Sequence, residues 1–225
     1  LVADHFAGTE LQVALVAIDP RSGHIKAMVG GRDYAENQYN RVFAATRQPG
    51  SSFKPIVYLT ALMQDGFTAV TAFDSKPTAF VYDEGRKTYR PNNFGGKYFG
   101  MIDMGTAIAK SDNIYAVNTI MAVGPQRVID TARALGITGP LEPVPSLALG
   151  TSPVSPFEMA AAFGVLANQG VRVEPVAILR IEDSQGNILY EAEPKQEQVV
   201  PAEHAYILTK LMEGVFDPGG TGARV

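Results

Sequence analysis

A serine and a lysine stand three residues apart at Ser51 and Lys54, directly after Gly50. If a helix begins at Ser51, this spacing puts both side chains on one face, and the amine of Lys54 can reach the Ser51 hydroxyl. A serine hydroxyl needs such a base to become a good nucleophile, and the backbone N–H groups at a helix start stabilise a developing oxyanion. The pair therefore indicates that Ser51 could be an activated nucleophile with Lys54 as its base.

This chemistry sets two conditions on Lys54. Its amine can act as a base only if burial or a neighbouring cation lowers its pKa enough to leave it neutral. Pro55 disfavours a helical conformation at Lys54 and cannot donate to the Ser51 carbonyl, so Pro55 is compatible only with the first turn of the helix. The structural alternative is that Ser51 caps a helix and Lys54 is a solvated side chain.

A second polar group, Ser111-Asp112-Asn113, lies between two segments with helical periodicity. A bend between two helices can direct the side chains of Ser111 and Asn113 into a cleft. The structural alternative is that Ser111 is the N-cap of a helix over residues 114–123.

The apolar periodicity indicates which elements hold these groups. Apolar runs on either side of turn residues predict hairpins over residues 11–29 and 171–192. Helical spacing of apolar residues predicts helices over residues 51–64, 107–110, 114–123, 126–135, 155–169 and 202–215. This order favours one α+β domain whose sheet mixes N-terminal and C-terminal strands.

Two of these predictions have further detail. The helix over residues 155–169 has Ser155 as N-cap, followed by Pro156 and Glu158, which is a well-signalled start. Residues 69–101 are dense in proline and glycine and predict a long irregular segment with short strands, a kind of segment that often carries function. Three of its aromatic residues, Tyr89, Tyr98 and Phe99, are expected either to line a substrate groove or to pack in the core.

Composition excludes several classes of site. The net charge is −4 and the basic residues are scattered singly, so no nucleic-acid partner is expected. The chain has no cysteine, and His5, His24 and His204 lie far apart, so neither a metal site, a cofactor nor a serine-histidine triad is expected. No apolar run approaches the roughly 20 residues that span a bilayer.

The motifs together resemble the transpeptidase domain of bifunctional, class A penicillin-binding proteins. S-x-x-K and S-D-N belong to the motif set of penicillin-binding proteins and class A β-lactamases. The stretch R-Q-P-G-S-S-F-K-P over residues 47–55 is far more specific than S-x-x-K alone. Residues 17–31 resemble the opening hairpin of that domain, residues 109–117 its second motif, and residues 149–170 its long helix and the approach to it.

This resemblance implies a fold, roles and a substrate. The fold would be α+β, as in penicillin-binding transpeptidases and serine β-lactamases, with an antiparallel sheet flanked by helices. Ser51 would be the acylated nucleophile, Lys54 its base, and Ser111 a proton relay to the leaving amine, while Asn113 would bind the substrate amide. The substrate would be a peptidoglycan stem ending in D-Ala-D-Ala, and β-lactams would acylate the same serine. The site would lie on the outer face of the cytoplasmic membrane, in the periplasm or cell wall.

The third motif of the set, K-T-G, does not occur in these 225 residues. The string Gly220-Thr221-Gly222 has Gly219 in place of the lysine and resembles the G-T-G segment that precedes the K-T-G strand. We therefore expect residues 1–225 to be a partial transpeptidase domain, incomplete at the C-terminus. The remaining part is either present as another chain or lacking, in which case the fragment is inactive. A membrane anchor and a glycosyltransferase domain would lie before Leu1.

Three alternatives remain at this stage. The same acyl-enzyme could be hydrolysed, which would make a D,D-carboxypeptidase or a β-lactamase. A non-catalytic β-lactam sensor or protein-binding module would be acylated without crosslinking. A purely structural domain, with the motifs serving as helix caps, would not be acylated.

Overall fold

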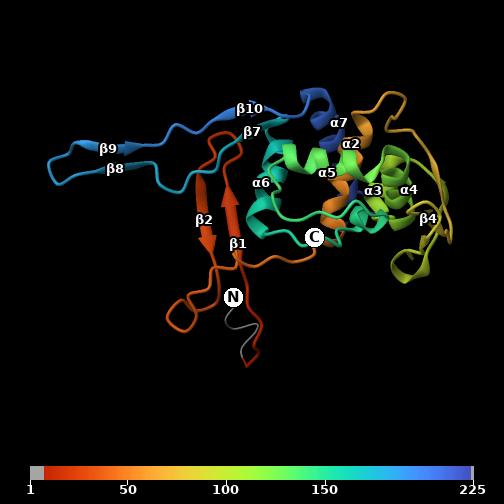
Figure 1. Ribbon diagram of the computed structural model, residues 1–225, viewed down its shortest axis with the longest axis horizontal. Coiled ribbons are helices and arrows are strands. Elements are labelled where there is room, and N and C mark those ends of the chain that lie inside the picture. The colour runs from red at the N-terminus through yellow and green to blue at the C-terminus, as the bar shows by residue number, and fades with distance from the viewer. Residues whose placement is uncertain (1–7, 224–225) are drawn as a thin grey trace.

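The computed structural model describes residues 8–223 (Figure 1). Its α-helices are α2 (Lys54–Leu62), α3 (Met104–Lys110), α4 (Asn113–Val123), α5 (Pro125–Ala134), α6 (Pro156–Ala167) and α7 (Ala202–Glu213). The 3-10 helices are η1 (Gly50–Phe53), η2 (Phe94–Gly96), η3 (Pro145–Leu149) and η4 (Gly214–Phe216). The strands are β1 (Leu15–Ile18), β2 (Ile25–Val29), β3 (Phe73–Ser75), β4 (Phe80–Tyr82), β5 (Lys87–Tyr89), β6 (Gly100–Ile102), β7 (Val171–Val173), β8 (Arg180–Glu182), β9 (Ile188–Glu191) and β10 (Gln196–Gln198). Each predicted helix is present, with bounds shifted by no more than about one turn.

The helices form one body around α2. Residues 56–62 of α2 are all buried, and the helix packs against α4, α5 and α7. A helix that is buried on all sides is held by packing over its whole surface. The position of the residues at its start, Ser51 and Lys54, is therefore fixed by the core.

The capping box predicted for α6 is present. The Ser155 hydroxyl accepts a hydrogen bond from the Glu158 amide, and the Glu158 carboxylate accepts one from the Ser155 amide. Burial alone would raise the pKa of Glu158, but hydrogen bonds from Thr138 and Ser155 to its carboxylate lower the pKa to about 2. Glu158 thus stabilises the start of α6 as a charged group.

The strands pair antiparallel, but they form five two-stranded sheets in the described residues. β1 and β2 stand beside α6, and β8 and β9 extend away from the helical body as an arm (Figure 1). The α+β class is confirmed, whereas the N-terminal and C-terminal strands meet only at an isolated bridge between His24 and Val176. The prediction of one sheet that mixes N-terminal and C-terminal strands is therefore wrong for the described residues.

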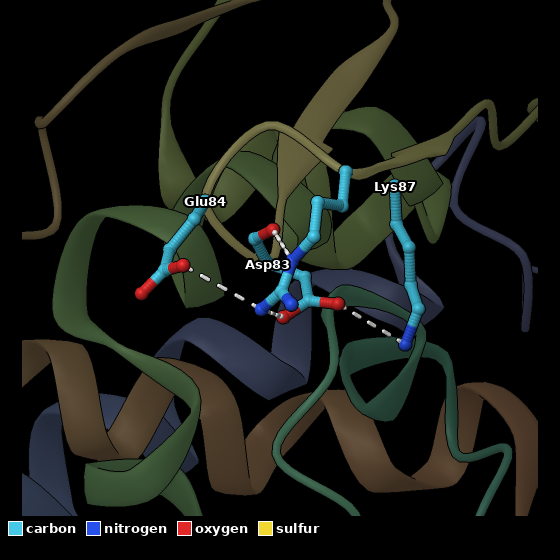
Figure 2. Close-up of polar contacts among 4 residues, drawn as sticks. Asp83, Glu84 and Lys87 are labelled. Carbon is cyan, nitrogen blue, oxygen red and sulfur yellow. Dashed lines mark hydrogen bonds and ion pairs between the residues drawn. The ribbon is translucent and has the colours of Figure 1, made fainter.

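The segment over residues 69–101 is irregular, as predicted, and its strands are short. The turn between β4 and β5 has Asp83 and Glu84 at φ 55° and 53°, which is unfavourable for residues with a side chain. The Arg86 guanidinium contacts the carboxylates of Asp83 and Glu84 at 2.8 and 3.5 Å. Lys87 contacts Asp83 at 3.3 Å, and Figure 2 shows this pair beside Glu84. Exposed ion pairs thus join the side chains of this strained turn.

Two glycines meet directly before Ser51. The Gly50 amide donates to the Gly150 carbonyl at 3.3 Å, where η3 ends. Gly150 has φ +65°, and a Cβ there would lie 2.3 Å from the Gly50 carbonyl oxygen and 2.6 Å from its nitrogen. Only glycine at position 150 leaves room for the backbone that leads into η1.

We therefore expect Gly150→Ala to lower the free energy of unfolding more than Gly66→Ala does. Gly66 also has positive φ, at +80°, but no atom lies within 4 Å of a Cβ placed there. Both alanines carry the cost of a left-handed conformation, about 1–2 kcal/mol, and only the one at position 150 adds a clash with backbone. Urea denaturation measures the difference. Equal losses would show that the backbone at Gly50 shifts without cost.

Candidate active site

Ser51 and Lys54 lie at the start of the central helix, as predicted. Ser51 is exposed in η1, and Lys54 is the first residue of α2. Lys54 has φ −54° and ψ −39° and donates its N–H to the Ser51 carbonyl. It is therefore helical although Pro55 follows it, because packing of η1 and α2 overrides the local preference. Pro55 falls within the first turn, which is where the sequence required it.

The side chain of Lys54 is only 3% exposed, and its amine lies among three oxygen acceptors. Lys54 Nζ donates to the Ser111 carbonyl at 2.7 Å, to Ser111 Oγ at 3.1 Å and to Asn113 Oδ1 at 2.7 Å. Ser51 and Lys54 line the same cavity, of about 270 Å³, together with Ser111. Among the described residues no hydrogen bond joins Lys54 Nζ to Ser51 Oγ, so the Lys54 amine is bound to the second motif in this structure and not to Ser51.

The environment of Lys54 satisfies the condition that the sequence set. Burial lowers its pKa from the ordinary 10.5 to about 8, and the nearby charge of Asp112 opposes part of this shift. At pH 7 roughly a tenth of the amine is then neutral, compared with a negligible fraction for a solvated lysine. The solvated alternative for Lys54 is therefore wrong.

The turn between α3 and α4 brings Ser111 and Asn113 to Lys54. Ser111 ends α3 at φ 52° and ψ 45°, a left-handed conformation that is rare for a residue other than glycine. The N-cap of α4 is Asp112, whose carboxylate accepts from the Tyr115 amide at 2.7 Å, so the alternative role of Ser111 as that N-cap is wrong. The strained backbone directs Ser111 towards the amine, as is common at functional sites.

A buried network behind this turn was not predicted from the sequence. The Asn93 side chain accepts from the Asn113 amide at 2.7 Å and donates to Asp112 at 2.6 Å, and the Ser75 hydroxyl donates to Asp112 at 2.5 Å. The Asn92 carbonyl accepts from Asn113 Nδ2 at 2.7 Å. The only sequence signal was the Asn92-Asn93 pair within the long irregular segment, whose position says nothing about its partners.

Ser51, Ser111 and Asn113 open on one cleft of about 600 Å³. Besides these three, its lining comprises Asn93, Phe94, Lys97, Phe99, Lys110, Gly219 and Thr221. Of the three aromatic residues considered from the sequence, Phe99 lines the cleft, and Tyr89 and Tyr98 pack against the core. The two motifs thus share one solvent-accessible space large enough for a peptide.

Other kinds of site were searched for in the same residues. Within residues 8–223 no cluster of histidine and acidic side chains is arranged to hold a metal ion. His24 lies in a β-bridge and His204 in α7, while His5 lies outside the described residues. Nor does any helix in this range have the length and apolarity to cross a membrane.

A helical body that carries the serine and lysine of S-x-x-K on one cavity is the arrangement expected of penicillin-binding proteins. Residues 13–225 match the family model described as the penicillin binding protein transpeptidase domain, and the chain belongs to this family. Over 212 residues it is 44% identical to penicillin-binding protein 2D of Bacillus subtilis, covering 94% of this chain and 30% of that protein. Penicillin-binding protein 1A of Aquifex aeolicus is 37% identical over 210 residues, with 93% and 29% covered. The resemblance to class A proteins is confirmed.

Solved structures agree with this assignment. Penicillin-binding protein 1A from Haemophilus influenzae has a TM-score of 0.87 at 26% identity, over 95% of this chain and 37% of that one. The PonA1 protein from Mycobacterium tuberculosis, in complex with penicillin V, has a TM-score of 0.80 at 25% identity, over 94% and 58%. The chain spans only about 30% of the length of the curated relatives named above.

The site makes a direct prediction about Lys54. In an NMR titration of lysine-labelled protein, its amine should titrate at about 8, and Asp112→Asn should move the midpoint lower because it removes the charge that favours the ammonium. Lys210 is a control in the same spectra, since a hydrogen bond to Glu213 raises its pKa and it should stay charged through this range. A Lys54 midpoint near 10.5 would contradict the burial effect.

Proposed function

We propose that this domain is a D,D-transpeptidase that crosslinks peptidoglycan stem peptides through an acyl-enzyme on Ser51. The observation that carries this proposal is the buried amine of Lys54, with a pKa of about 8, bound to Ser111 and Asn113 and lining one cavity with Ser51. Membership of the transpeptidase family supports the general reaction class.

In the first half-reaction Ser51 Oγ attacks the carbonyl carbon of the penultimate D-Ala. Its proton passes to the neutral amine of Lys54, and backbone N–H groups of the first turn at Ser51 stabilise the oxyanion. Ser111 Oγ lies 3.1 Å from Lys54 Nζ and relays the proton to the amine of the terminal D-Ala, which leaves as the C–N bond breaks. Asn113 Nδ2 gives one N–H to Asn92 and has a second for the substrate amide.

In the second half-reaction an amine from a neighbouring stem attacks the ester on Ser51. The amine loses a proton, the C–O bond to Ser51 breaks, and Ser51 Oγ regains a proton through Lys54 and Ser111. A β-lactam acylates Ser51 by the same first step. Because the bond that breaks lies in a ring, the released amine stays attached to the acyl group, and the ester persists. Water in place of the acceptor amine would give a carboxypeptidase.

The wider context is part of the same proposal. Residues 1–225 are part of the transpeptidase domain, and the K-T-G strand that completes the cleft comes from outside them, further along the protein or as another chain. A membrane anchor and a glycosyltransferase domain accompany it, and the site works on the outer face of the cytoplasmic membrane. The greater length of the class A relatives supports this arrangement.

We expect the full-length protein to form a stable adduct with benzylpenicillin, which intact-mass spectrometry detects. Ser51→Ala should abolish the adduct. Ser52→Ala is the matched control in the same cavity, because the Ser52 hydroxyl donates to the Pro49 carbonyl at 2.7 Å and forms none of the hydrogen bonds of Lys54. The adduct should form faster as pH rises towards about 8 and then level off, since only neutral Lys54 accepts the proton.

A stem peptide donor with an acceptor amine then separates the fates of the acyl group. Crosslinked product supports the transpeptidase. If the acyl group is only hydrolysed, the protein is a carboxypeptidase or β-lactamase and not a transpeptidase. If the adduct forms but no product is released, the protein is a β-lactam sensor. An adduct that survives Ser51→Ala would overturn the assignment of the nucleophile.

A further inference from the structure

The cleft in front of Ser51 differs in charge from the rest of the chain. The chain has 23 acidic and 19 basic residues, whereas the described residues that line the cleft include two lysines and no acidic residue. Lys97 follows η2, and Lys110 is the last residue of α3, so the two cations come from different segments. A groove with cations and no counter-charge attracts anionic groups.

Neither of these lysines forms an ion pair in the part of the chain that the structure describes. Lys76, Lys87 and Lys210 are paired with Asp74, Asp83 and Glu213 at 2.8, 3.3 and 2.8 Å, and Figure 2 shows the pair at Lys87. By contrast, the side chain of Lys97 is exposed and has no hydrogen bond or ion pair with any residue in the described part of the chain. Its charge is therefore available to a ligand.

Lys110 has a fixed position but also keeps free donors. Its amine donates to the Gly219 carbonyl at 2.7 Å, and the Thr221 amide donates to the Ala109 carbonyl at 3.0 Å, so this wall of the cleft is held in place. An ammonium has three N–H donors, and a neutral carbonyl engages one of them. Two donors and the full positive charge of Lys110 remain.

Lys97 belongs to the segment that positions Asn113. The Asn93 side chain donates to the Lys97 carbonyl at 2.9 Å and accepts from the Asn113 amide at 2.7 Å. The backbone of Lys97 is therefore bound to the same side chain that holds Asn113, the residue proposed to bind the donor amide, and both residues line the cleft.

We propose that Lys97 and Lys110 form an anion subsite that selects donor stems carrying a carboxylate before the D-Ala-D-Ala terminus. This inference rests on the proposed function and specifies its substrate class. Such a stem offers two carboxylates of the same chemistry, one on the γ-linked glutamate and one on the side chain of a dicarboxylic third residue. A carboxamide at the selected position is neutral and loses the charge-assisted hydrogen bonds.

The test compares three synthetic stem donors: one with both carboxylates, one with the glutamate amidated and one with the third residue amidated. Release of D-Ala gives kcat/KM for each donor with the parent protein and with Lys97→Gln, Lys97→Arg, Lys110→Gln and Lys87→Gln. The last variant removes one positive charge outside the cleft. Benzylpenicillin adducts on every variant report separately whether Ser51 is acylated.

At either the glutamate or the third residue, the kcat/KM of the parent protein should be about fivefold to tenfold higher for the carboxylate donor than for the carboxamide donor. This is the effect expected of a partly exposed charged hydrogen bond. Lys97→Gln and Lys110→Gln should remove this preference, and Lys97→Arg and Lys87→Gln should keep it. An unchanged preference in both glutamine variants, or none in the parent, would overturn the subsite while benzylpenicillin adducts still form. Loss of the adduct from the parent itself would instead overturn the proposed function.

Discussion

The buried amine of Lys54 is the feature on which the rest of the site depends. Taking a cation out of water costs several kcal/mol unless the fold supplies acceptors. Here Ser111 and Asn113 supply three oxygens within 3.1 Å, and within residues 8–223 no carboxylate pairs with the amine. The all-round burial of α2 fixes the lysine, and the turn between α3 and α4 fixes its acceptors. The two motifs therefore need each other: without the turn, the lysine would be a buried charge without partners.

The turn between α3 and α4 is itself held in place by the irregular segment over residues 69–101. Asp112 is 1% exposed and its carboxylate is held by Ser75, Asn93 and the Tyr115 amide. A buried carboxylate satisfied in this way is rigid, and its charge raises the pKa of Lys54 against the larger effect of burial. The network thus has two effects at once: it holds Asn113 in place, and it limits how far the pKa of the base falls. A segment without regular structure is in this way part of the active site.

The sequence predicted what depends on local spacing. The capping box of α6 needs only residues three apart, and the position of Lys54 one turn after Ser51 follows from helix geometry. The contacts of Lys54 with Ser111 and Asn113 span more than 50 positions, and those of Asn93 with Asp112 span 19, so no local rule specifies them. The left-handed conformation of Ser111 was also beyond prediction, because it is strained locally and is stabilised by tertiary contacts. The prediction of a mixed sheet was wrong because the choice of strand partners also depends on tertiary contacts and not on local spacing.

The acceptors around Lys54 are arranged for an ammonium, which is the form that the proposed proton transfer from Ser51 would produce. Three N–H donors meet three oxygens, so the charged product of proton transfer is met by dipoles that are already in place. Burial acts in the opposite direction and keeps part of the amine neutral before the reaction. A site that only stabilised the ammonium would raise the pKa of the amine and keep it protonated. A site that only buried the amine would lower its pKa until it could not take up a proton. Because catalysis depends on stabilising the transition state more than the ground state, a pKa near 8 between these two effects is what a serine–lysine pair requires.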